Sequence, residues 1–204
     1  MRYNKKKFIY LISPPKIERN FFKDLNEVLK QKKTSYFQLR LKKGSFKKKL
    51  IIGRKIQKIC KKFKVKFLIN DDVYLAKKLN ADGCHLGQKD MKIKEARKLI
   101  GKKIIGITCH NSIKLAKTAI KNKADYLAFG AFNSSKTKKV KYKASISLLK
   151  KARKITNTPI VVIGGINSKN YKNLLLNKAN FLAISNYIWK NKKLKPINAI
   201  KKLI

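Results

Sequence analysis

The sequence predicts an α/β fold, a single (β/α)8 TIM barrel, and three observations support this. Eight short apolar segments recur along the 204 residues. Lys-rich segments with helical spacing separate them, which indicates alternating strands and helices. Most of the apolar segments are near-continuous, as expected for parallel strands that are covered on both faces. The length lies at the short end of the range for such barrels, and a doubly wound open sheet is the alternative architecture.

The expected strands are rich in β-branched residues and follow one another at intervals along the chain. In order they read F-I-Y-L-I from Phe8, Y-F-Q-L-R from Tyr36, F-L-I-N from Phe67, G-C-H-L from Gly83, I-I-G-I-T from Ile104, Y-L-A-F-G from Tyr126, P-I-V-V-I-G from Pro159 and F-L-A-I-S from Phe181. No Gly/Ser/Pro-rich linker divides them, so we expect one domain over residues 1–204.

The intervening segments show apolar faces at helical spacing. Three such faces are Phe22, Leu25, Val28 and Leu29; Leu50, Ile51, Ile56 and Ile59; and Ile113, Leu115, Ala116, Ala119 and Ile120. Asn111-Ser112 and Asn167-Ser168 are helix-start signals, since Asn and Ser favour the N-cap position. The last helix is expected to begin near Pro196.

The charge is strongly basic, with a formal net charge of +45. The excess is made of 48 Lys against 6 Arg, and it is spread over every expected helix. This pattern is typical of a biased composition, whereas nucleic-acid readers favour Arg for bidentate contacts. We therefore predict no specific nucleic-acid partner, although the charge favours anionic small molecules. A basic barrel that binds nucleic acid is the least favoured function.

The N-terminal segment and the cysteines bear on location. The apolar part of the N-terminus is too short for a signal peptide and meets Pro14-Pro15, and no segment is long enough to span a bilayer. The three cysteines are odd in number and widely spaced, which fits a reducing compartment. We predict a cytoplasmic protein with no membrane partner, and a homo-oligomer is possible.

Acidic residues gather in one part of this basic chain. Four of the nine carboxylates lie between Asn70 and Asp90, and Asp71 and Asp90 follow two expected strands. The carboxyl ends of barrel strands meet at one face, where the chemistry of such barrels is found. Magnesium usually binds one or two carboxylates plus substrate phosphates. The pattern predicts a Mg2+ site at Asp71 and Asp90 that holds a phosphorylated substrate.

The other strand ends supply cations, hydroxyls and glycines that suit phosphate. Arg and Lys pair with phosphate oxygens, and Gly-rich turns or helix N-termini let backbone N–H groups approach a phosphate. The residues at these positions are Gln38, Arg40, Lys42, Thr108, Ser135, Thr137, Lys138, Gly164-Gly165, Ile184 and Ser185.

Some polar residues of the same region have simpler interpretations. Asp72 is suited to open the following helix, because acidic side chains favour the first turn. Asp82-Gly83 is typical of a turn. His85 lies within a strand and is expected to be packed or hydrogen-bonded. His110 stays open between a structural role and proton transfer.

The order and spacing of several motifs resemble the thiamine phosphate synthase/TenI superfamily over nearly the whole chain, from Tyr10 to Ser185. The motifs are Q-L-R-L-K, I-N-D-D-V-Y-L-A, A-D-G-C-H-L-G-Q-K-D-M, I-I-G-I-T-C-H and V-V-I-G-G-I-N. The resemblance implies a (β/α)8 transferase of thiamine biosynthesis. Such an enzyme joins a hydroxymethylpyrimidine diphosphate to a hydroxyethylthiazole phosphate and releases thiamine monophosphate and pyrophosphate.

The resemblance also implies roles for individual residues. Magnesium would bind Asp71 and Asp90, and the pyrimidine would bind Asn70. The pyrimidine diphosphate would contact Gln38, Arg40 and Lys42, and its leaving pyrophosphate would lie near Thr108 and Lys138. Catalysis is expected of Arg40, Thr108 and Lys138. The thiazole phosphate would bind Gly165, Ile184 and Ser185, with Ser135 and Thr137.

The chain departs from the family pattern in the loop after the sixth strand. The family reads G-P-x-F-P-T-x-T-K, whereas this chain reads G-A-F-N-S-S-K-T-K. Both prolines are absent, and Ser135 replaces the first Thr. The thiazole tautomerase branch of the superfamily is therefore the alternative function, with His110 as a candidate proton-transfer residue.

Overall fold

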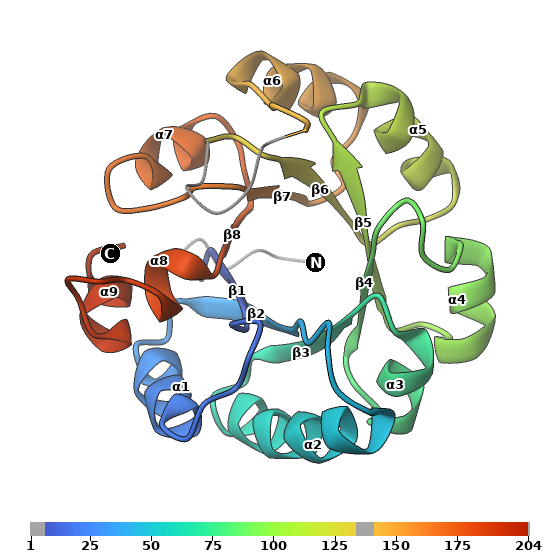
Figure 1. Ribbon diagram of the computed structural model, residues 1–204. Coiled ribbons are helices and arrows are strands. Elements are labelled where there is room, and N and C mark those ends of the chain that lie inside the picture. The colour runs from blue at the N-terminus through green and yellow to red at the C-terminus, as the bar shows by residue number, and fades with distance from the viewer. Residues whose placement is uncertain (1–6, 134–140, 204) are drawn as a thin grey trace.

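The computed structural model describes residues 7–133 and 141–203, and its strands form a closed parallel barrel in chain order (Figure 1). The strands are β1 (Ile9–Ile12), β2 (Thr34–Leu39), β3 (Lys66–Asn70), β4 (Gly83–Leu86), β5 (Ile104–His110), β6 (Tyr126–Gly130), β7 (Ile160–Ile163) and β8 (Phe181–Ile184). The first strand pairs with the last, because β1 hydrogen-bonds β8 as well as β2. The predicted barrel is confirmed, and the alternative open sheet is wrong.

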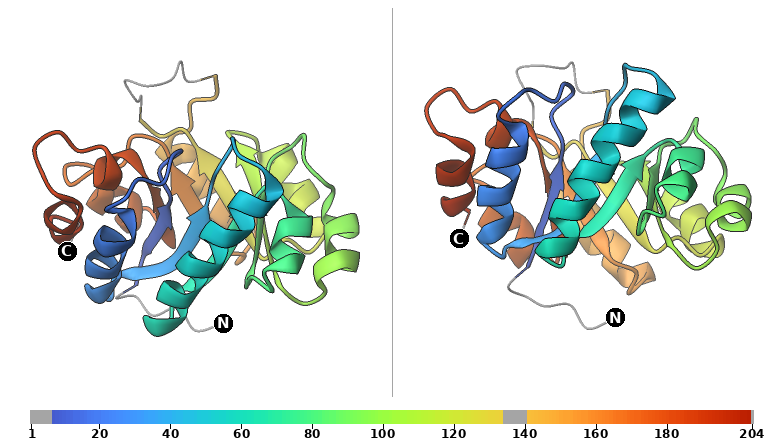
Figure 2. Two further views of the ribbon diagram at one scale, coloured as in Figure 1. Left: turned by 60° about the horizontal axis from the view of Figure 1, so that its bottom comes forward. Right: turned by 90° about the horizontal axis from the view of Figure 1, so that it is seen from below.

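Helices surround the barrel and run alongside its strands (Figure 2). They are α1 (Phe21–Lys30), α2 (Phe46–Lys62), α3 (Val73–Lys78), α4 (Ile93–Ile100), α5 (Ile113–Lys121), α6 (Ile146–Ile155), α7 (Tyr171–Leu176), α8 (Asn186–Trp189) and α9 (Pro196–Lys201). Ser112 caps α5 as predicted, accepting from the backbone N–H of Leu115 at 3.2 Å. Over the described ranges, no helix is both long enough and apolar enough to cross a membrane.

Two sequence-based details of the helices are wrong. Ser168 does not cap α7, which begins at Tyr171 after Asn170, because the Asn167 side chain instead closes a local turn by accepting from the backbone N–H of Lys169. Ile51 does not lie on the buried face of α2 and is 49% exposed, while the buried positions of this helix are Gly53, Ile56 and Cys60.

Each strand sends alternate side chains into the barrel and outward to the helices. The outward side chains form the larger apolar core with the helices. The inward side chains form a separate cluster made of Tyr10, Ile12, Tyr36, Leu68, Tyr126, Ala128, Val161, Phe181 and Ala183. Three tyrosine hydroxyls therefore enter the interior of the barrel, where a buried polar group needs a partner.

Gly106 in β5 makes room for Tyr126, one of the three inward tyrosines. A Cβ atom at Gly106 would lie 1.8 Å from Cζ of Tyr126, so the ring could not keep its position. The glycine of the I-I-G-I-T segment thus lets the ring of Tyr126 lie across the barrel against the neighbouring strand. This close approach brings its hydroxyl toward the carboxyl ends of β4 and β5.

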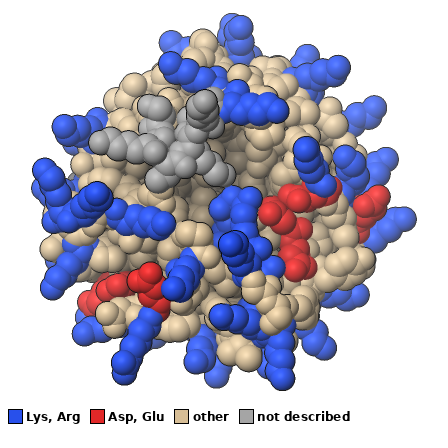
Figure 3. Space-filling view, in the orientation of Figure 1, with Lys and Arg blue, Asp and Glu red and all other residues tan. Residues whose placement is uncertain are grey.

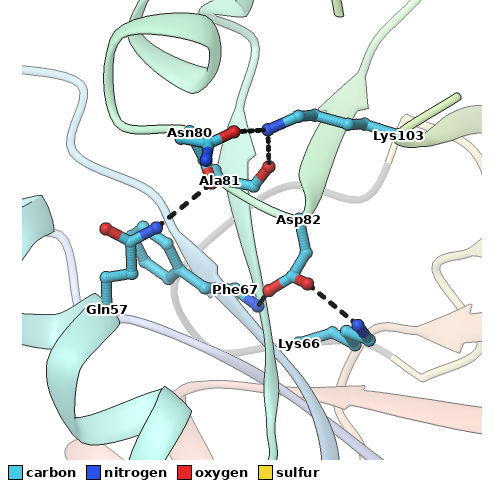
Figure 4. A network of polar contacts seen from close by, with 7 residues as sticks. All are labelled: Gln57, Lys66, Phe67, Asn80, Ala81, Asp82 and Lys103. Carbon is cyan, nitrogen blue, oxygen red and sulfur yellow. Dashed lines mark hydrogen bonds and ion pairs between the residues drawn. The ribbon is translucent and has the colours of Figure 1, made fainter. Parts of the chain in front are cut away.

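A repeated contact, here called a bracket, is found at the opposite end of the barrel before β4, β6 and β8: the side chain of the residue before the strand accepts from a backbone N–H of the preceding strand. Asp82 accepts from the backbone N–H of Phe67 at 2.9 Å, and its own N–H donates to the Phe67 carbonyl at 2.9 Å (Figure 4). Lys66 lies 3.0 Å from the same carboxylate. Asp82-Gly83 is therefore structural but is not a turn, because Gly83 already begins β4.

The same bracket recurs at the two following even strands. Asp125 accepts from the N–H of Ile105 at 2.8 Å, and Asn180 accepts from the N–H of Ile160 at 2.8 Å. Each of these residues follows an alanine, in A-D, A-D and A-N pairs. An Arg side chain supports each of the latter two, Arg97 for Asp125 and Arg153 for Asn180. Two of the nine acidic residues, Asp82 and Asp125, thus serve the fold rather than a site.

Candidate active site

The expected site residues that the structure describes lie at the carboxyl ends of the strands or just beyond them. Gln38 and Asn70 are the last inward-facing residues of β2 and β3, and Thr108 lies in β5. Arg40, Asp71 and Asp90 follow strands. On this face, acidic side chains gather beside basic ones near the centre (Figure 3). The predicted clustering of cations and carboxylates at one end of the barrel is therefore present.

The Asp71 and Asp90 carboxylates lie close enough to interact directly. Desolvation, a hydrogen bond with Asp90 and repulsion by the Asp90 charge raise the pKa of Asp71 to about 6, and Arg40 and Lys42 oppose this rise. Part of the Asp71 side chain remains exposed to solvent, which limits the effect of desolvation. The neighbouring Asp90 carboxylate is therefore the cause of the raised pKa that is specific to this site. Two carboxylates this close favour either a shared proton or a cation between them.

Backbone contacts hold both carboxylates in place. Oδ2 of Asp90 accepts from the N–H of Gly87 at 2.6 Å, which closes the turn after β4 and leaves Oδ1 available. The N–H of Asp71 donates to the carbonyl of His85 at 2.8 Å, and Asp71 has a left-handed φ of 64°. This conformation is uncommon for a residue with a Cβ atom, and such residues concentrate at functional sites. Asp72 caps α3 as predicted, accepting from Leu75 at 2.9 Å.

Arg40 and Lys42 supply positive charge beside these carboxylates. Both oppose the rise in the pKa of Asp71, which places their charges close to it. The backbone N–H of Arg40 donates to Oγ of Ser13 at 2.9 Å, and the carbonyl of Ser13 accepts from Ser185 at 3.2 Å. Ser13 is 2% exposed and joins the ends of β1, β2 and β8, a role that the sequence analysis did not identify.

Gln38 and Asn70 form a polar pair inside the barrel. Nε2 of Gln38 donates to Oδ1 of Asn70 at 2.6 Å, and Gln38 is 2% exposed. The bond fixes both amide groups, so that the Gln38 carbonyl oxygen and the Asn70 amide nitrogen stay available. An acceptor beside a donor is complementary to the ring nitrogens and amino group of a heterocycle.

His85 is the centre of a buried chain of hydrogen bonds. Its Nδ1 lies 2.8 Å from the hydroxyl of Tyr126 and its Nε2 lies 2.8 Å from Oγ1 of Thr108. The Tyr126 hydroxyl lies 2.8 Å from the hydroxyl of Tyr10. Burial is the main reason why the pKa of His85 is lowered to about 4, with the nearby Asp90 charge opposing the fall and the Arg40 charge contributing to it. The expectation that His85 is hydrogen-bonded is confirmed.

Tyr10 and Tyr126 were not identified from the sequence as polar partners of the site. Each reads as an ordinary apolar position of a strand, and both are nearly inaccessible to solvent. The available signal was Gly106, since a glycine inside a strand often marks the close approach of a large group.

A second part of the mouth is a cavity between the ends of β7, β8 and β1. Its lining combines apolar side chains, including Ile163 and Ile166, with Arg40, Gly165 and Ser185. Gly164 has a φ of 108°, and a Cβ atom there would lie 2.4 Å from Cβ of Ala131. Gly164 is therefore required by the close packing of the segments after β6 and β7. Ile184 is buried behind this cavity.

Other predicted residues are placed as follows. Ser135, Thr137 and Lys138 lie outside the described residues. His110 ends β5 and stacks on the ring of Tyr142, with centroids 4.1 Å apart. Burial and Lys141 lower the pKa of His110. Within residues 7–133 and 141–203, no group of three or more His, Cys, Asp or Glu residues could hold a metal ion by itself.

Comparisons with known proteins agree with this geometry. A family model described as "Thiamine monophosphate synthase" matches residues 9–188. The chain is 68% identical over its whole length to the "Thiamine-phosphate synthase" of Pelagibacter ubique (strain HTCC1062), covering 100% of both proteins. It is 39% identical to the "Thiamine-phosphate synthase" of Erythrobacter litoralis (strain HTCC2594), covering 89% of this chain and 87% of that protein.

A solved structure gives the same result. The "Thiamine phosphate pyrophosphorylase from Pyrococcus furiosus" superposes with a TM-score of 0.85 at 26% identity, covering 98% of this chain and 94% of that one. The sequence motifs, the barrel and the relatives agree over nearly the full length. The chain belongs to the thiamine monophosphate synthase family.

Proposed function

We propose that this chain is a transferase that joins a hydroxymethylpyrimidine diphosphate to a hydroxyethylthiazole phosphate, giving thiamine monophosphate and pyrophosphate. The observation that carries the proposal is the Asp71–Asp90 pair, flanked by Arg40 and Lys42, at the carboxyl ends of the barrel strands. The 68% identity to a protein named thiamine-phosphate synthase supports the same reaction.

The two carboxylates fit a magnesium ion. They suit it because Mg2+ takes few protein ligands and completes its coordination with water and substrate phosphates. Two close carboxylates without a third acidic partner among the described residues match that requirement. Desolvation and the neighbouring Asp90 carboxylate raise the pKa of Asp71, and a bound cation would offset both effects. Asp71 and Asp90 would hold the ion, which when bound neutralises part of the charge of the departing pyrophosphate.

The chain's own residues would perform the remaining tasks at the pyrimidine end. Gln38 and Asn70 orient the pyrimidine ring through their available amide groups. Arg40 and Lys42 contact the diphosphate, with Thr108 and, from outside the described residues, Lys138. Breakage of the C–O bond leaves positive charge on the pyrimidine methylene and negative charge on pyrophosphate. Cations fixed beside the leaving oxygens stabilise that charge most strongly when it is fully developed.

The second substrate would occupy the cavity near β8. Gly165 and Ser185 would receive the thiazole phosphate, with Ile184 behind them and Ser135 and Thr137 contributing from outside the described residues. Ile163 is 38% exposed toward the mouth. An apolar wall there would pack against a heterocycle and exclude water, which would otherwise capture the pyrimidine cation before the thiazole nitrogen does.

The alternative tautomerase function is not favoured. A tautomerase acting on a thiazole carboxylate phosphate needs no metal–diphosphate site, whereas this chain pairs Asp71 with Asp90 beside two cations. The ring of His110, its candidate proton-transfer residue, stacks on Tyr142. We also propose a cytoplasmic location, which three buried free cysteines support, because structural disulfides are rare in that compartment.

The direct test is product analysis. The protein is incubated with both substrates and Mg2+, and thiamine monophosphate and pyrophosphate are quantified by chromatography. Formation of both products in equal amounts supports the proposal. Isomerisation of a thiazole carboxylate phosphate without coupling would establish the tautomerase function instead.

A further inference from the structure

Tyr10, Tyr126, His85 and Thr108 form a chain of hydrogen bonds inside the barrel. The hydroxyl at the buried end of the chain determines which group donates and which accepts at each step. Tyr10 is 1% exposed, and Tyr126 is the one hydrogen-bond partner of its hydroxyl among the described residues. A buried O–H group without an acceptor is costly, whereas a hydroxyl oxygen tolerates an unused lone pair. The proton of Tyr10 therefore points at the oxygen of Tyr126.

The position of this proton then fixes the position of each following proton along the chain. Since Tyr126 accepts from Tyr10, its own proton must go to its other partner, Nδ1 of His85 at 2.8 Å. Nδ1 thus serves as an acceptor and carries no proton. A neutral imidazole has one N–H, so the proton lies on Nε2 and is donated to Oγ1 of Thr108 at 2.8 Å.

The last group in the chain is the one that faces the candidate site. With one lone pair of Oγ1 engaged by His85, the hydroxyl proton of Thr108 cannot point back at the ring. The backbone carbonyl of Thr108 is held by the side-chain amide of Gln88. The hydroxyl of Thr108 is therefore left as a donor toward the mouth, where an anionic oxygen is its best acceptor.

We propose that Tyr126 and His85 form a polarised relay, with Tyr10 beyond it at the buried end, that fixes His85 as its Nε2–H tautomer and makes Thr108 a hydrogen-bond donor to the diphosphate. His85 and Tyr126 are then positioning residues that act through Thr108. The role toward diphosphate rests on the function proposed above, whereas the polarity of the relay depends only on the buried contacts.

The opposite polarity would reverse the donor and the acceptor in each of these hydrogen bonds. There Thr108 would donate to Nε2, His85 would donate from Nδ1 to Tyr126, and Tyr126 would donate to Tyr10. The proton of Tyr10 would have no acceptor among the described residues, and Thr108 could offer a diphosphate only a lone pair. A lone pair facing an anion is repulsive, so this arrangement would oppose the proposed substrate.

The tautomer can be read directly by NMR on the full chain. The sequence contains two histidines, so protein labelled with 15N-histidine gives two imidazole patterns, and a His110→Gln variant assigns them. Long-range 1H–15N correlation distinguishes a protonated from an unprotonated ring nitrogen. We expect His85 to show protonated Nε2 and unprotonated Nδ1 in neutral buffer. A protonated Nδ1 would overturn the proposed polarity.

Two matched substitutions test the consequence for the site. Tyr126→Phe removes the donor to Nδ1, while Tyr10→Phe removes an identical hydroxyl one step further away. In Tyr10→Phe the Tyr126 hydroxyl becomes the buried end of the chain, and Nδ1 of His85 is its remaining acceptor among the described residues. We therefore expect this variant to keep the tautomer and to bind magnesium pyrophosphate within twofold of the unsubstituted protein. We expect Tyr126→Phe to mix the tautomers and weaken that binding about tenfold, the value of one charge-assisted hydrogen bond.

The readouts separate this inference from the proposed reaction. Calorimetric titration with magnesium pyrophosphate requires no turnover, so a protein that failed to make thiamine monophosphate would still report on the relay. Unchanged pyrophosphate affinity in Tyr126→Phe would overturn the role assigned to Thr108. An equal disturbance of the His85 ring in both variants would overturn the direction, because only the reverse polarity makes Tyr10 as important as Tyr126.

Discussion

Asp71 and Asp90 interact directly at the mouth of the barrel, although they are separated by a helix, a strand and two loops. The pairing of β3 with β4 brings them together, because Asn70 is in register with His85 and each carboxylate follows one of these strands. The repulsion between the two carboxylates is the main specific electrostatic feature of the candidate site, and it leads to the first two predictions.

Asp71→Asn is expected to abolish magnesium-dependent turnover while stabilising the protein in the absence of metal. The substitution removes the repulsion with Asp90, and Asn tolerates the left-handed φ of 64° better than Asp does. We expect a gain of about 1 kcal/mol in the free energy of unfolding at neutral pH, a value reduced to allow for the exposed part of the side chain. Thermal unfolding in a chelator and product formation with Mg2+ measure the two effects.

The neighbouring residue provides the control for this substitution. Asp72→Asn keeps an N-cap side chain of α3, so turnover and stability should both stay close to those of the unsubstituted protein. If Asp71→Asn retained full activity, or if both variants lost activity equally, the assignment of Asp71 to the metal would be wrong.

The apparent affinity for Mg2+ is expected to fall below pH 6. The pKa of Asp71 is raised to about 6, so protons compete with the cation there, and each further unit of pH should weaken binding about tenfold. The raised pKa also means that Asp71 contributes most to the stability of the metal-free protein below its usual pKa of 3.8, and that this contribution is lost as pH rises through about 6. Magnesium titrations and chemical unfolding between pH 4 and 8 test both trends.

Arg40→Ala is expected to slow the chemical step. Arg40 lies beside the carboxylate pair and lines the cavity near β8, so its charge can stabilise pyrophosphate as it leaves. The single-turnover rate with saturating substrates should fall about 100-fold, as it does when a preorganised charge-stabilising donor is removed. Lys43→Ala, an exposed lysine of the same segment, should change the rate less than twofold. A change confined to the Michaelis constants would show that Arg40 only binds substrate.

Asp125→Ala is expected to destabilise the barrel by about 2 kcal/mol without changing the site. It leaves the N–H of Ile105 without its acceptor and removes the ion pair of Arg97, whose remaining acceptors are backbone carbonyls. The chain itself provides the matched control. Asn180 performs the same task at β7 with an amide oxygen, so Asp125→Asn should cost less than about 1 kcal/mol. Urea unfolding measures both variants, and equal losses would indicate that the charge of Asp125, rather than its hydrogen bond, stabilises this end of the barrel.

The sequence by itself determined the barrel and the residues at its mouth. Continuous apolar runs such as F-L-I-N and Y-L-A-F-G can be buried on both faces only as parallel strands between helices. Once the strands are ordered, the polar residues after them must share one end of the barrel, and this placed Asp71, Asp90 and Arg40 together. Local signals were also sufficient where the chemistry is local, as for the Ser112 and Asp72 caps.

The tertiary structure alone decided which polar groups face one another. Asp82 and Asp125 have the same side chain as Asp71, yet they close the opposite end of the barrel, because the residue that precedes a strand and the residue that follows it lie at opposite ends. Tyr10 and Tyr126 are 116 positions apart and meet only across the interior. The alternation of side chains along a strand predicts which of them point inward. Strand tilt, register and the space left by Gly106 determine which hydroxyl reaches His85.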